Sequence, residues 1–521
     1  MRQLPALSCL FLILALSSFG QEYDLIIRHG HILDGTGRPS YAGDVAVKDG
    51  KIAALGSFPG TGHTEVDAQG RVIAPGFIDV HTHSEEVSDL PNVENFIRMG
   101  VTTIITGNCG TSRVDIGTFF DELTRTPVTV NVASLIGHNS VRFQVMGGSF
   151  ARPPTDAEMK QMRHLVDQAM KDGAVGLSTG LIYLPGTFAR TEELVELAKG
   201  ASAGGGIYTS HMRYENYRIR EALDEVFRIA REAHIPAEVS HIKLSGPNAW
   251  GQAADILAYL DQARSSGLTL THDLYAYTAS STNLSAPIPA EAREGGLSRY
   301  KQRLADPAGK AKIVEEMKAT LKRSERGDYT YAVIASCKVD PRLNGKTVPQ
   351  AAKILRGSDS LDDQIETILD LEARDKVSAV FHGMNEADLQ KFLVHPLTMI
   401  ASDSSPRKFG EDVPHPRGYG NNARILGRYV RELHLLTLED AVRKMTSLPA
   451  HTFHLAGRGE LQPGFVADIV IFDPNTVSDP SNYDDPHHYA TGFSDIIVNG
   501  VAVIRAGTLT GARPGRPVRL K

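Results

Sequence analysis

The stretch Ala74-Pro75-Gly76-Phe77-Ile78-Asp79-Val80-His81-Thr82-His83 decides the fold class of this chain. Residues 76–83 form a largely apolar run of the length of one β-strand, and the run ends on two histidines. Residues i and i+2 of a strand face the same side. We therefore expect the side chains of His81 and His83 to point together, so that one cation can bind both.

Seven more runs of strand length follow, alternating with stretches that have the length and pattern of amphipathic helices. The eight candidate strands are residues 76–83, 101–108, 128–137, 174–181, 207–211, 237–243, 268–275 and 398–403. Strands that alternate with helices are typical of parallel sheets, and eight such units close into a barrel. The sequence therefore predicts the α/β class with a (β/α)8 TIM-type barrel.

The chain is longer than such a barrel requires, and the remainder suggests further parts. Short β-prone segments joined by turns occupy residues 21–75 and 450–521, and we expect both chain ends to join in one small β-sandwich domain. The barrel then spans residues 76–449. The gap between the seventh and eighth candidate strands exceeds one helix and its loops, which predicts an insertion at residues 284–375 on the top face of the barrel.

The composition excludes several classes of partner. Of the 521 residues, 41% are hydrophobic and 22% are charged, as in an ordinary soluble globular protein. The formal net charge is −6, and there is no basic stripe. Nothing therefore favours nucleic acid or a polybasic membrane contact as the partner. We expect a small-molecule substrate instead.

The first residues have the pattern of an export signal. Arg2 supplies a positive charge, residues 10–16 are apolar, and Ser18-Phe19-Gly20 offers the small residues that a signal peptidase reads. The apolar run is too short to span a bilayer. We expect a signal peptide at residues 1–20, cleavage near Gly20-Gln21, and a secreted or periplasmic protein without an integral membrane segment after cleavage.

Side chains able to bind a metal stand at the ends of the candidate strands, which is where active sites of this fold lie. They are His81, His83, Cys109, His211, His241 and Asp403. Taken singly, a strand histidine is usually a core residue, a lone cysteine a small buried hydrophobe, and a strand-end aspartate a helix cap. Six such residues at the strand ends of one barrel favour a metal centre. Cys337 is the only other cysteine after residue 20, so a disulfide framework is excluded.

The strand-one stretch resembles the motif of the amidohydrolase superfamily, and the resemblance covers nearly all of the mature chain. Many members carry a carboxylated lysine at the end of strand four, but residues 173–181 contain no lysine. That departure argues against the hydantoinase, dihydroorotase and isoaspartyl dipeptidase branches. Cys109 takes the place of the lysine, since a thiolate suits zinc and can bridge two metals. The chain is thus similar to the D-aminoacylase (N-acyl-D-amino-acid deacylase) family, which shares Gly107-Asn108-Cys109-Gly110, Gly180-Leu181-Ile182-Tyr183, Ser210-His211-Met212-Arg213, Ser240-His241-Ile242-Lys243, Ala401-Ser402-Asp403-Ser404 and the insertion.

The resemblance implies a role for each site residue. Cys109, His211 and His241 would hold one tightly bound Zn²⁺. A second, weaker site would share Cys109 and add His81, His83 and Asp403, with Asp403 also acting as general base and acid. The substrate's carboxylate and acyl group would contact Tyr183, Lys243, Tyr275, Ser281 and Arg417.

The implied reaction is zinc-dependent hydrolysis of the amide bond of N-acyl-D-amino acids, which releases a carboxylate and a free D-amino acid. Zinc lowers the pKa of bound water to about 7, the resulting hydroxide attacks the amide, and Asp403 transfers the proton to the departing amine. Two alternatives stay open. One is a related amidohydrolase for N-acyl-D-glutamate or N-acyl-D-aspartate, N-acyl dipeptides or cyclic amides. The other is a zinc-binding extracytoplasmic protein without catalysis, in which Asp403 would have no proton to move.

Overall fold

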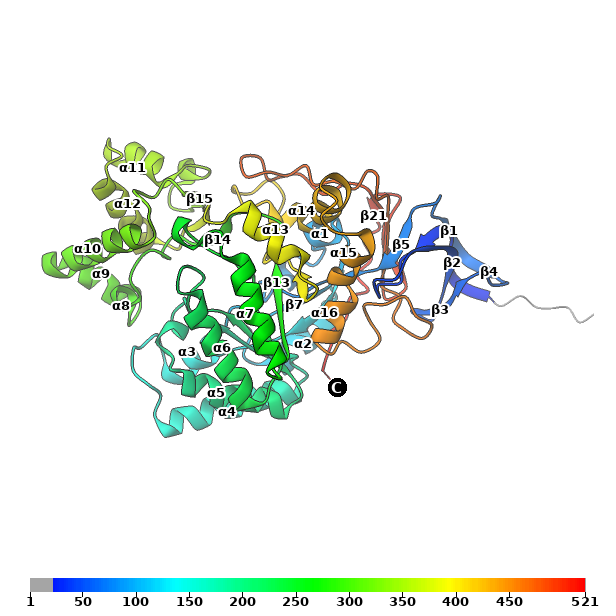
Figure 1. The fold of residues 1–521 in the computed structure, drawn as a ribbon, viewed down its shortest axis with the longest axis horizontal. Coiled ribbons are helices and arrows are strands. Elements are labelled where there is room, and N and C mark those ends of the chain that lie inside the picture. Colours follow the sequence, from blue (N-terminus) through cyan, green and yellow to red (C-terminus); the bar gives the residue numbers. More distant parts are fainter. Residues whose placement is uncertain (1–21, 521) are drawn as a thin grey trace, which may run out of the picture.

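The computed structural model describes residues 22–520. The predicted signal peptide and its cleavage site lie outside these described residues. None of the helices within residues 22–520 is long and apolar enough to cross a membrane. The described chain forms a central barrel, with a β domain at one end of the molecule and an excursion rich in helices at the other (Figure 1).

Eight parallel strand positions form the barrel, which confirms the predicted (β/α)8 fold. Neighbouring strands pair in chain order. The ring closes where Asp403 N donates to His81 O at 2.9 Å and His83 N donates to Ser404 O at 2.7 Å. The strands are β6 (Phe77–Asp79), β7 (Val101–Thr106), β8 (Asn131–Ser134) continued by β9 (Ile136–Gly137), β10 (Gly176–Gly180), β11 (Ile207–His211), β12 (Ala237–Val239), β13 (Leu270–Leu274) and β17 (Thr398–Ile400).

Most barrel strands end earlier than the predicted runs. The runs at 76–83 and 398–403 each contribute a strand of only three residues. The backbone turns left-handed at His241, with φ of 38°, and at Asp403, with φ of 50°. That conformation cannot continue an extended strand, so the side chains of His241 and Asp403 lie on loops just beyond the strands.

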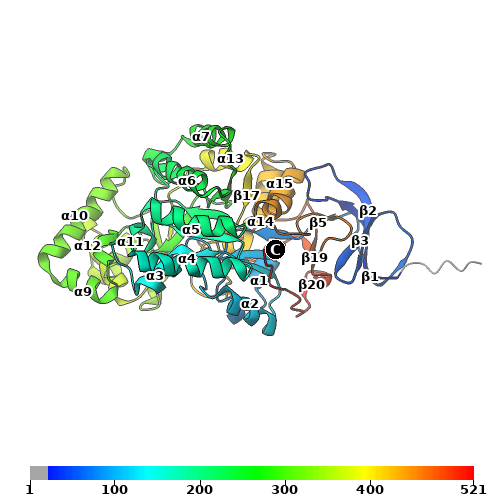
Figure 2. The ribbon, with the colours of Figure 1, turned by 90° about the horizontal axis from the view of Figure 1, so that it is seen from below.

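Helices cover the outside of the barrel (Figures 1 and 2). In α4, Thr155 and Glu158 form a capping box at the first turn, and Met162 and Val166 are fully buried on the inner face. The covering helices are α1 (Glu94–Ile97), α2 (Ile116–Arg125), α3 (His138–Met146), α4 (Asp156–Lys171), α5 (Thr191–Ala203), α6 (Ile219–Ala233), α7 (Ala253–Ser265), α13 (Glu386–Val394), α14 (Arg417–Arg424), continued by a π-helix (Ile425–Glu432), α15 (Leu438–Met445) and α16 (Ser447–Thr452).

Both chain ends contribute to one nine-stranded sheet in the β domain. The two ends meet where β5 pairs antiparallel with β18, and β4 joins the sheet by pairing in parallel with β1. Ile27, Ile73 and Ile469 are buried in its apolar core. The strands are β1 (Glu22–Ile32), β2 (Tyr41–Lys48), β3 (Lys51–Gly56), β4 (Thr61–Asp67), β5 (Val72–Pro75), β18 (Ile469–Phe472), β19 (Phe493–Val498), β20 (Val501–Arg505) and β21 (Thr508–Leu509).

The C-terminal tail leaves this sheet and returns to the barrel, although the sequence suggested that residues 450–521 stay in the β domain. Gly515 N donates to Val128 O at 2.9 Å, and Val518 N donates to Val132 O at 2.8 Å. The Val518 side chain packs in the apolar cluster that contains Ile105. The tail therefore covers the end of the barrel at which strand β8 begins.

The excursion between β13 and β17 is wider than the predicted residues 284–375 at both ends. It begins with β14 and returns through β16, and these two strands pair with β15 in a small antiparallel sheet. The sequence of β14 is Ser-Ser-Thr-Asn, which carries no apolar signal. A separate apolar core supports this unit. Its elements are β14 (Ser280–Asn283), α8 (Ala290–Arg293), α9 (Leu297–Ala305), α10 (Pro307–Arg323), β15 (Ala332–Ser336), α11 (Val348–Arg356), α12 (Leu361–Arg374) and β16 (Ser378–Phe381).

Candidate metal centre and active site

The six predicted metal-binding residues lie together at the carboxyl ends of the barrel strands. His211 is the last residue of β11, and the other five follow β6, β7, β12 and β17 within four residues. Cys109, His241 and Asp403 all have left-handed backbone, with φ of 52°, 38° and 50°. Such strain costs about 1–3 kcal/mol per residue and clusters at functional sites, where the surrounding structure enforces it.

The thiol of Cys109 lies at the centre of three imidazoles. Its Sγ is 3.3 Å from His81 Nε2, 3.5 Å from His211 Nδ1 and 3.5 Å from His241 Nε2. A tetrahedral zinc with ordinary Zn–S and Zn–N bond lengths requires an S···N separation of about 3.5 Å. Cys109, His211 and His241 therefore already have the spacing that zinc needs.

Asp403 joins a second set of donors to the first. Its Oδ1 is 3.2 Å from His83 Nε2 and 3.7 Å from His81 Nε2, and its Oδ2 is 2.9 Å from Arg417 Nη1. Three sets of donor atoms each lie within 4.8 Å of one another: His81, His83 and Cys109; Cys109, His211 and His241; His81, His241 and Asp403. Soft sulfur, imidazole nitrogen and one carboxylate oxygen are a donor set that fits zinc.

The charges around the site favour the metal-binding forms of the anionic ligands. Burial alone would raise the pKa of Cys109, but the imidazoles of His81 and His211 hold the pKa of this thiol well below its usual value. Burial likewise opposes ionisation of Asp403, yet the Arg417 guanidinium and His81 bring the pKa of its carboxyl well below the ordinary range. Both shifts favour the ionised form, which a metal ligand requires.

Sequence reasoning missed two carboxylates that support the ligands, the fully buried Asp273 and the largely buried Glu215. Glu215 Oε1 is 2.6 Å from Lys243 Nζ and 2.9 Å from His241 Nδ1. Asp273 Oδ2 is 3.1 Å from His81 Nδ1, and its Oδ1 accepts a hydrogen bond from His241 N at 2.8 Å. The available signals were positional: Glu215 follows His211 by four residues, and Asp273 stands one residue before the end of β13.

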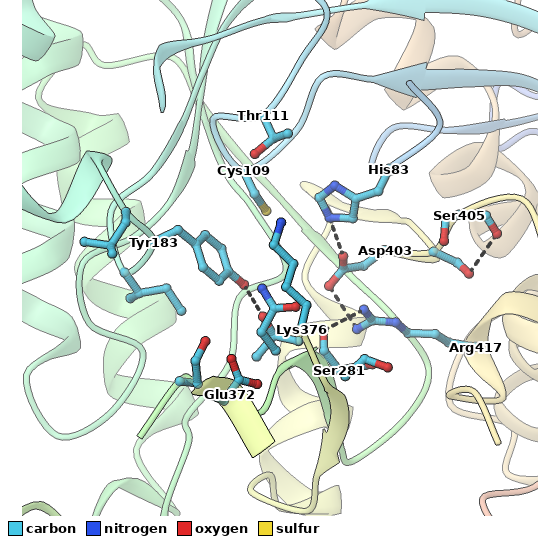
Figure 3. Close-up of a pocket in the computed structure, with 18 of the residues that line it drawn as sticks. His83, Cys109, Thr111, Tyr183, Ser281, Glu372, Lys376, Asp403, Ser405 and Arg417 are labelled. Atoms are coloured by element: carbon cyan, nitrogen blue, oxygen red, sulfur yellow. Dashed lines mark hydrogen bonds and ion pairs between the residues drawn. The ribbon is translucent and has the colours of Figure 1, made fainter. Parts of the chain in front are cut away.

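A cavity of about 570 Å³ opens onto the metal centre (Figure 3). Tyr183, Ser281 and Arg417 line it together with His83, Cys109 and Asp403. Arg417 Nη2 donates to Ser281 O at 3.4 Å, and Thr282 Oγ1 donates to Tyr183 Oη at 3.1 Å. Three of the five predicted substrate residues thus face the same space as the metal centre.

The other two predicted substrate residues are buried behind the cavity wall. Tyr275 is fully buried, and its ring centroid lies 4.5 Å from the guanidinium carbon of Arg417. Lys243 is 3% exposed and is held by Glu215. In this conformation both residues support the wall rather than forming its surface.

Cationic side chains outnumber carboxylates around the cavity. Four of its lining residues are cationic and two carry carboxylates: Arg293, Lys376, Arg407 and Arg417 against Glu372 and Asp403. Among the described residues, only Arg417 of these four cations forms an ion pair, and its partner is Asp403. The cavity therefore favours anionic ligands.

Comparison with known proteins agrees with this geometry. Residues 64–507 match the family described as the amidohydrolase family. The D-aminoacylase of Alcaligenes xylosoxydans xylosoxydans is 35% identical over 96% of this chain and 98% of its own.

Two solved structures are similar over nearly the whole chain. One is a D-aminoacylase described by its binuclear metal centre, with activation by one metal and attenuation by the second; its TM-score is 0.81 at 33% identity, over 95% of this chain and 100% of that chain. The other is the N-acyl-D-glutamate deacylase of Bordetella bronchiseptica with zinc and a phosphonate inhibitor, with a TM-score of 0.82 at 33% identity over 96% and 100%. The chain therefore belongs to the amidohydrolase family, within its D-aminoacylase branch.

Proposed function

We propose that this protein is a zinc-dependent hydrolase that cleaves the amide bond of N-acyl-D-amino acids and releases a carboxylate and a free D-amino acid. The observation that carries the proposal is one cavity in which Cys109 and Asp403 of the metal centre face Arg417, a cation suited to a substrate carboxylate. The activities named for the D-aminoacylase and N-acyl-D-glutamate deacylase relatives support the same reaction.

In this proposal the two metal positions differ in strength. Cys109, His211 and His241 form the tight zinc site, since all three are buried. His81, His83 and Asp403 form a weaker site that shares Cys109, and the side chain of His83 is 35% exposed to water. When bound, zinc makes a coordinated water nucleophilic at neutral pH and polarises the substrate carbonyl.

Asp403 is proposed to move the proton. Its carboxylate lies between the metal centre and Arg417, where it can accept the proton of the attacking water. Asp403 then gives that proton to the amine nitrogen as the C–N bond breaks. Arg417 holds Oδ2 and His83 faces Oδ1, so one carboxylate oxygen stays directed at the metal centre.

Preference for one enantiomer follows from holding the substrate at two points. Arg417 binds the α-carboxylate by charge-assisted hydrogen bonds, with the positive charge of Lys243 behind the wall. The metal centre holds the acyl carbonyl. The chiral carbon lies between these points, and its side chain is then directed along the wall that Tyr183 and Ser281 line.

A turnover screen of purified protein on paired N-acetyl-D- and N-acetyl-L-amino acids tests the proposal. We expect hydrolysis of the D-forms at rates at least tenfold above those of the L-forms. Equal rates for both enantiomers would refute the two-point model. No turnover of any amide would favour the non-catalytic zinc-binding alternative.

A narrower activity on N-acyl-D-glutamate or N-acyl-D-aspartate is favoured by the charge of the cavity. Arg417 binds the α-carboxylate, and the other three lining cations, which form no ion pair among the described residues, remain available to a second carboxylate. We therefore expect N-acetyl-D-glutamate to have a lower KM than N-acetyl-D-leucine in the same screen. An equal or higher KM for the acidic substrate would remove this alternative.

A further inference from the structure

We infer that Glu215 is a positioning residue that holds the imidazole of His241 in its metal-binding orientation, places a negative charge beside His211, and supplies the counter-charge of Lys243. The inference deepens the proposed function and rests on it only for the kinetic readout. Zinc affinity tests it independently of any substrate.

Glu215 is the one carboxylate that reaches this side of the centre. It stands on the loop between β11 and α6, and its side chain is only 12% exposed. Oε1 is 2.9 Å from His241 Nδ1, and Oε2 is 3.6 Å from His211 Nε2. Within residues 22–520, neither imidazole forms an ion pair with any other carboxylate.

The two rings present their other nitrogens to the metal position. His211 Nδ1 and His241 Nε2 each lie 3.5 Å from Cys109 Sγ. A neutral imidazole binds a cation through one nitrogen and carries its proton on the other. In both rings that second nitrogen is directed at Glu215. A carboxylate only accepts hydrogen bonds, so Glu215, at 2.9 Å from His241 Nδ1, selects the metal-binding tautomer of that ring. His211 Nε2 is 3.6 Å from Glu215 and forms no hydrogen bond among the described residues, so Glu215 acts on this ring by charge alone.

The Glu215 carboxylate also forms an ion pair with Lys243 at 2.6 Å. Lys243 Nζ lies 2.7 Å from His241 Nδ1, and both nitrogens face Glu215 Oε1. When Nδ1 carries its proton, the two groups are both donors and cannot bond to each other. Both need the oxygen between them. The ammonium is 3% exposed, and a buried charge without a partner is strongly destabilising.

The first experiment replaces Glu215 by glutamine, which keeps the shape and removes the charge. Zinc dissociation constants are measured on the purified full chain by competition with a chelator. We expect Glu215→Gln to bind zinc about 10–100-fold more weakly, the usual effect of losing a residue that orients a ligand. With zinc saturating, we expect a higher KM for N-acetyl-D-amino acids, because Lys243 has lost its anchor.

Glu225→Gln is the matched control. Glu225 lies on α6 and pairs with Arg213 at 3.0 Å, and within residues 22–520 no hydrogen bond or ion pair joins it to a metal-binding residue. This variant should keep the zinc affinity and KM of the parent within about twofold, as expected for a carboxylate remote from the ligands. A similar loss in both variants would mean that the effect is general, and would overturn the assignment.

A double variant separates orientation from charge balance, and it removes the buried lysine that the single variant leaves without an ion-pair partner. If Glu215 orients the ring of His241, Glu215→Gln with Lys243→Met still binds zinc weakly, whereas Lys243→Met alone keeps the parental affinity and raises KM. Recovery of parental zinc affinity in the double variant would overturn the positioning role. So would parental affinity in Glu215→Gln alone. If the parent hydrolyses no N-acyl-D-amino acid, the proposed function fails, while the zinc measurements still decide this inference.

Discussion

Replacement of Asp403 by asparagine removes one negative charge where the metal centre meets the carboxylate-binding arginine. Asp403 has contacts at 3.2 Å to His83 and 2.9 Å to Arg417, and asparagine preserves its shape. Loss of a general base and acid lowers kcat by about 10²-fold or more. That factor corresponds to about 2.7 kcal/mol of activation free energy.

The neighbours predict how KM and zinc content respond to the same change. Arg417 loses its only ion-pair partner, so its charge stays available to the substrate carboxylate and KM should not rise. Cys109, His211 and His241 are untouched, so the tight zinc should remain.

The assay measures kcat and KM on an N-acetyl-D-amino acid, with zinc determined on the same sample. Asp412→Asn is the matched control, because Asp412 is exposed, follows β17 on the same loop, and also has left-handed backbone, with φ of 60°. Near-parental kcat in Asp403→Asn would refute the proton-transfer role. A fall in kcat that is accompanied by loss of zinc would indicate that the main role of Asp403 is to bind the metal.

Three further predictions concern the metal, the chain start and the tail. Cys109→Ala should lose the tight zinc. Cys337→Ala should keep it, because the Cys337 thiol of the parent is buried in the apolar core of the excursion. Metal analysis of both variants tests this, and equal zinc content in the two would contradict the assignment of Cys109 as a ligand. We propose that the protein is exported and that N-terminal sequencing of exported material finds Gln21; an intact Met1 would contradict this. Deletion of the chain from residue 512 should lower the free energy of unfolding, because Val518 packs in an apolar cluster with barrel residues. We expect a loss of at least about 2 kcal/mol, the value of burying one valine side chain. An unchanged melting temperature would show that the tail does not stabilise the barrel.

The barrel could be predicted because its signal is local and repeated. The strand runs, such as 128–137, are rich in apolar residues and bounded by helix-length segments, and eight repeats leave few alternatives. The first and last residues of the excursion were harder to predict than the barrel strands. The reason is that β14 is polar and is stabilised by pairing with β16, about a hundred residues later in the chain. The return of the tail to β8 could not be predicted for the same reason, because Gly515 pairs with Val128, which is distant in the sequence.

The residues of the candidate site also differ in whether a local sequence signal identifies them. His81, Cys109 and Asp403 could be predicted because they are metal-binding residue types at the ends of predicted strands. Active sites of this fold lie at those ends. Glu215 and Asp273 act only through partners that the fold brings to them, across 26 and 192 residues to His241 and His81. A lone carboxylate in a sequence has many structural roles, so neither could be singled out before the packing was known.

The measurement that tests the central claim most directly is hydrolysis by metal-free protein to which zinc is added stepwise, with N-acetyl-D- and N-acetyl-L-leucine assayed in parallel. The account predicts no turnover without metal, recovery with the first equivalent of zinc, and faster hydrolysis of the D-form throughout. Turnover that persists in the metal-free protein, or equal rates for the two enantiomers, would contradict it.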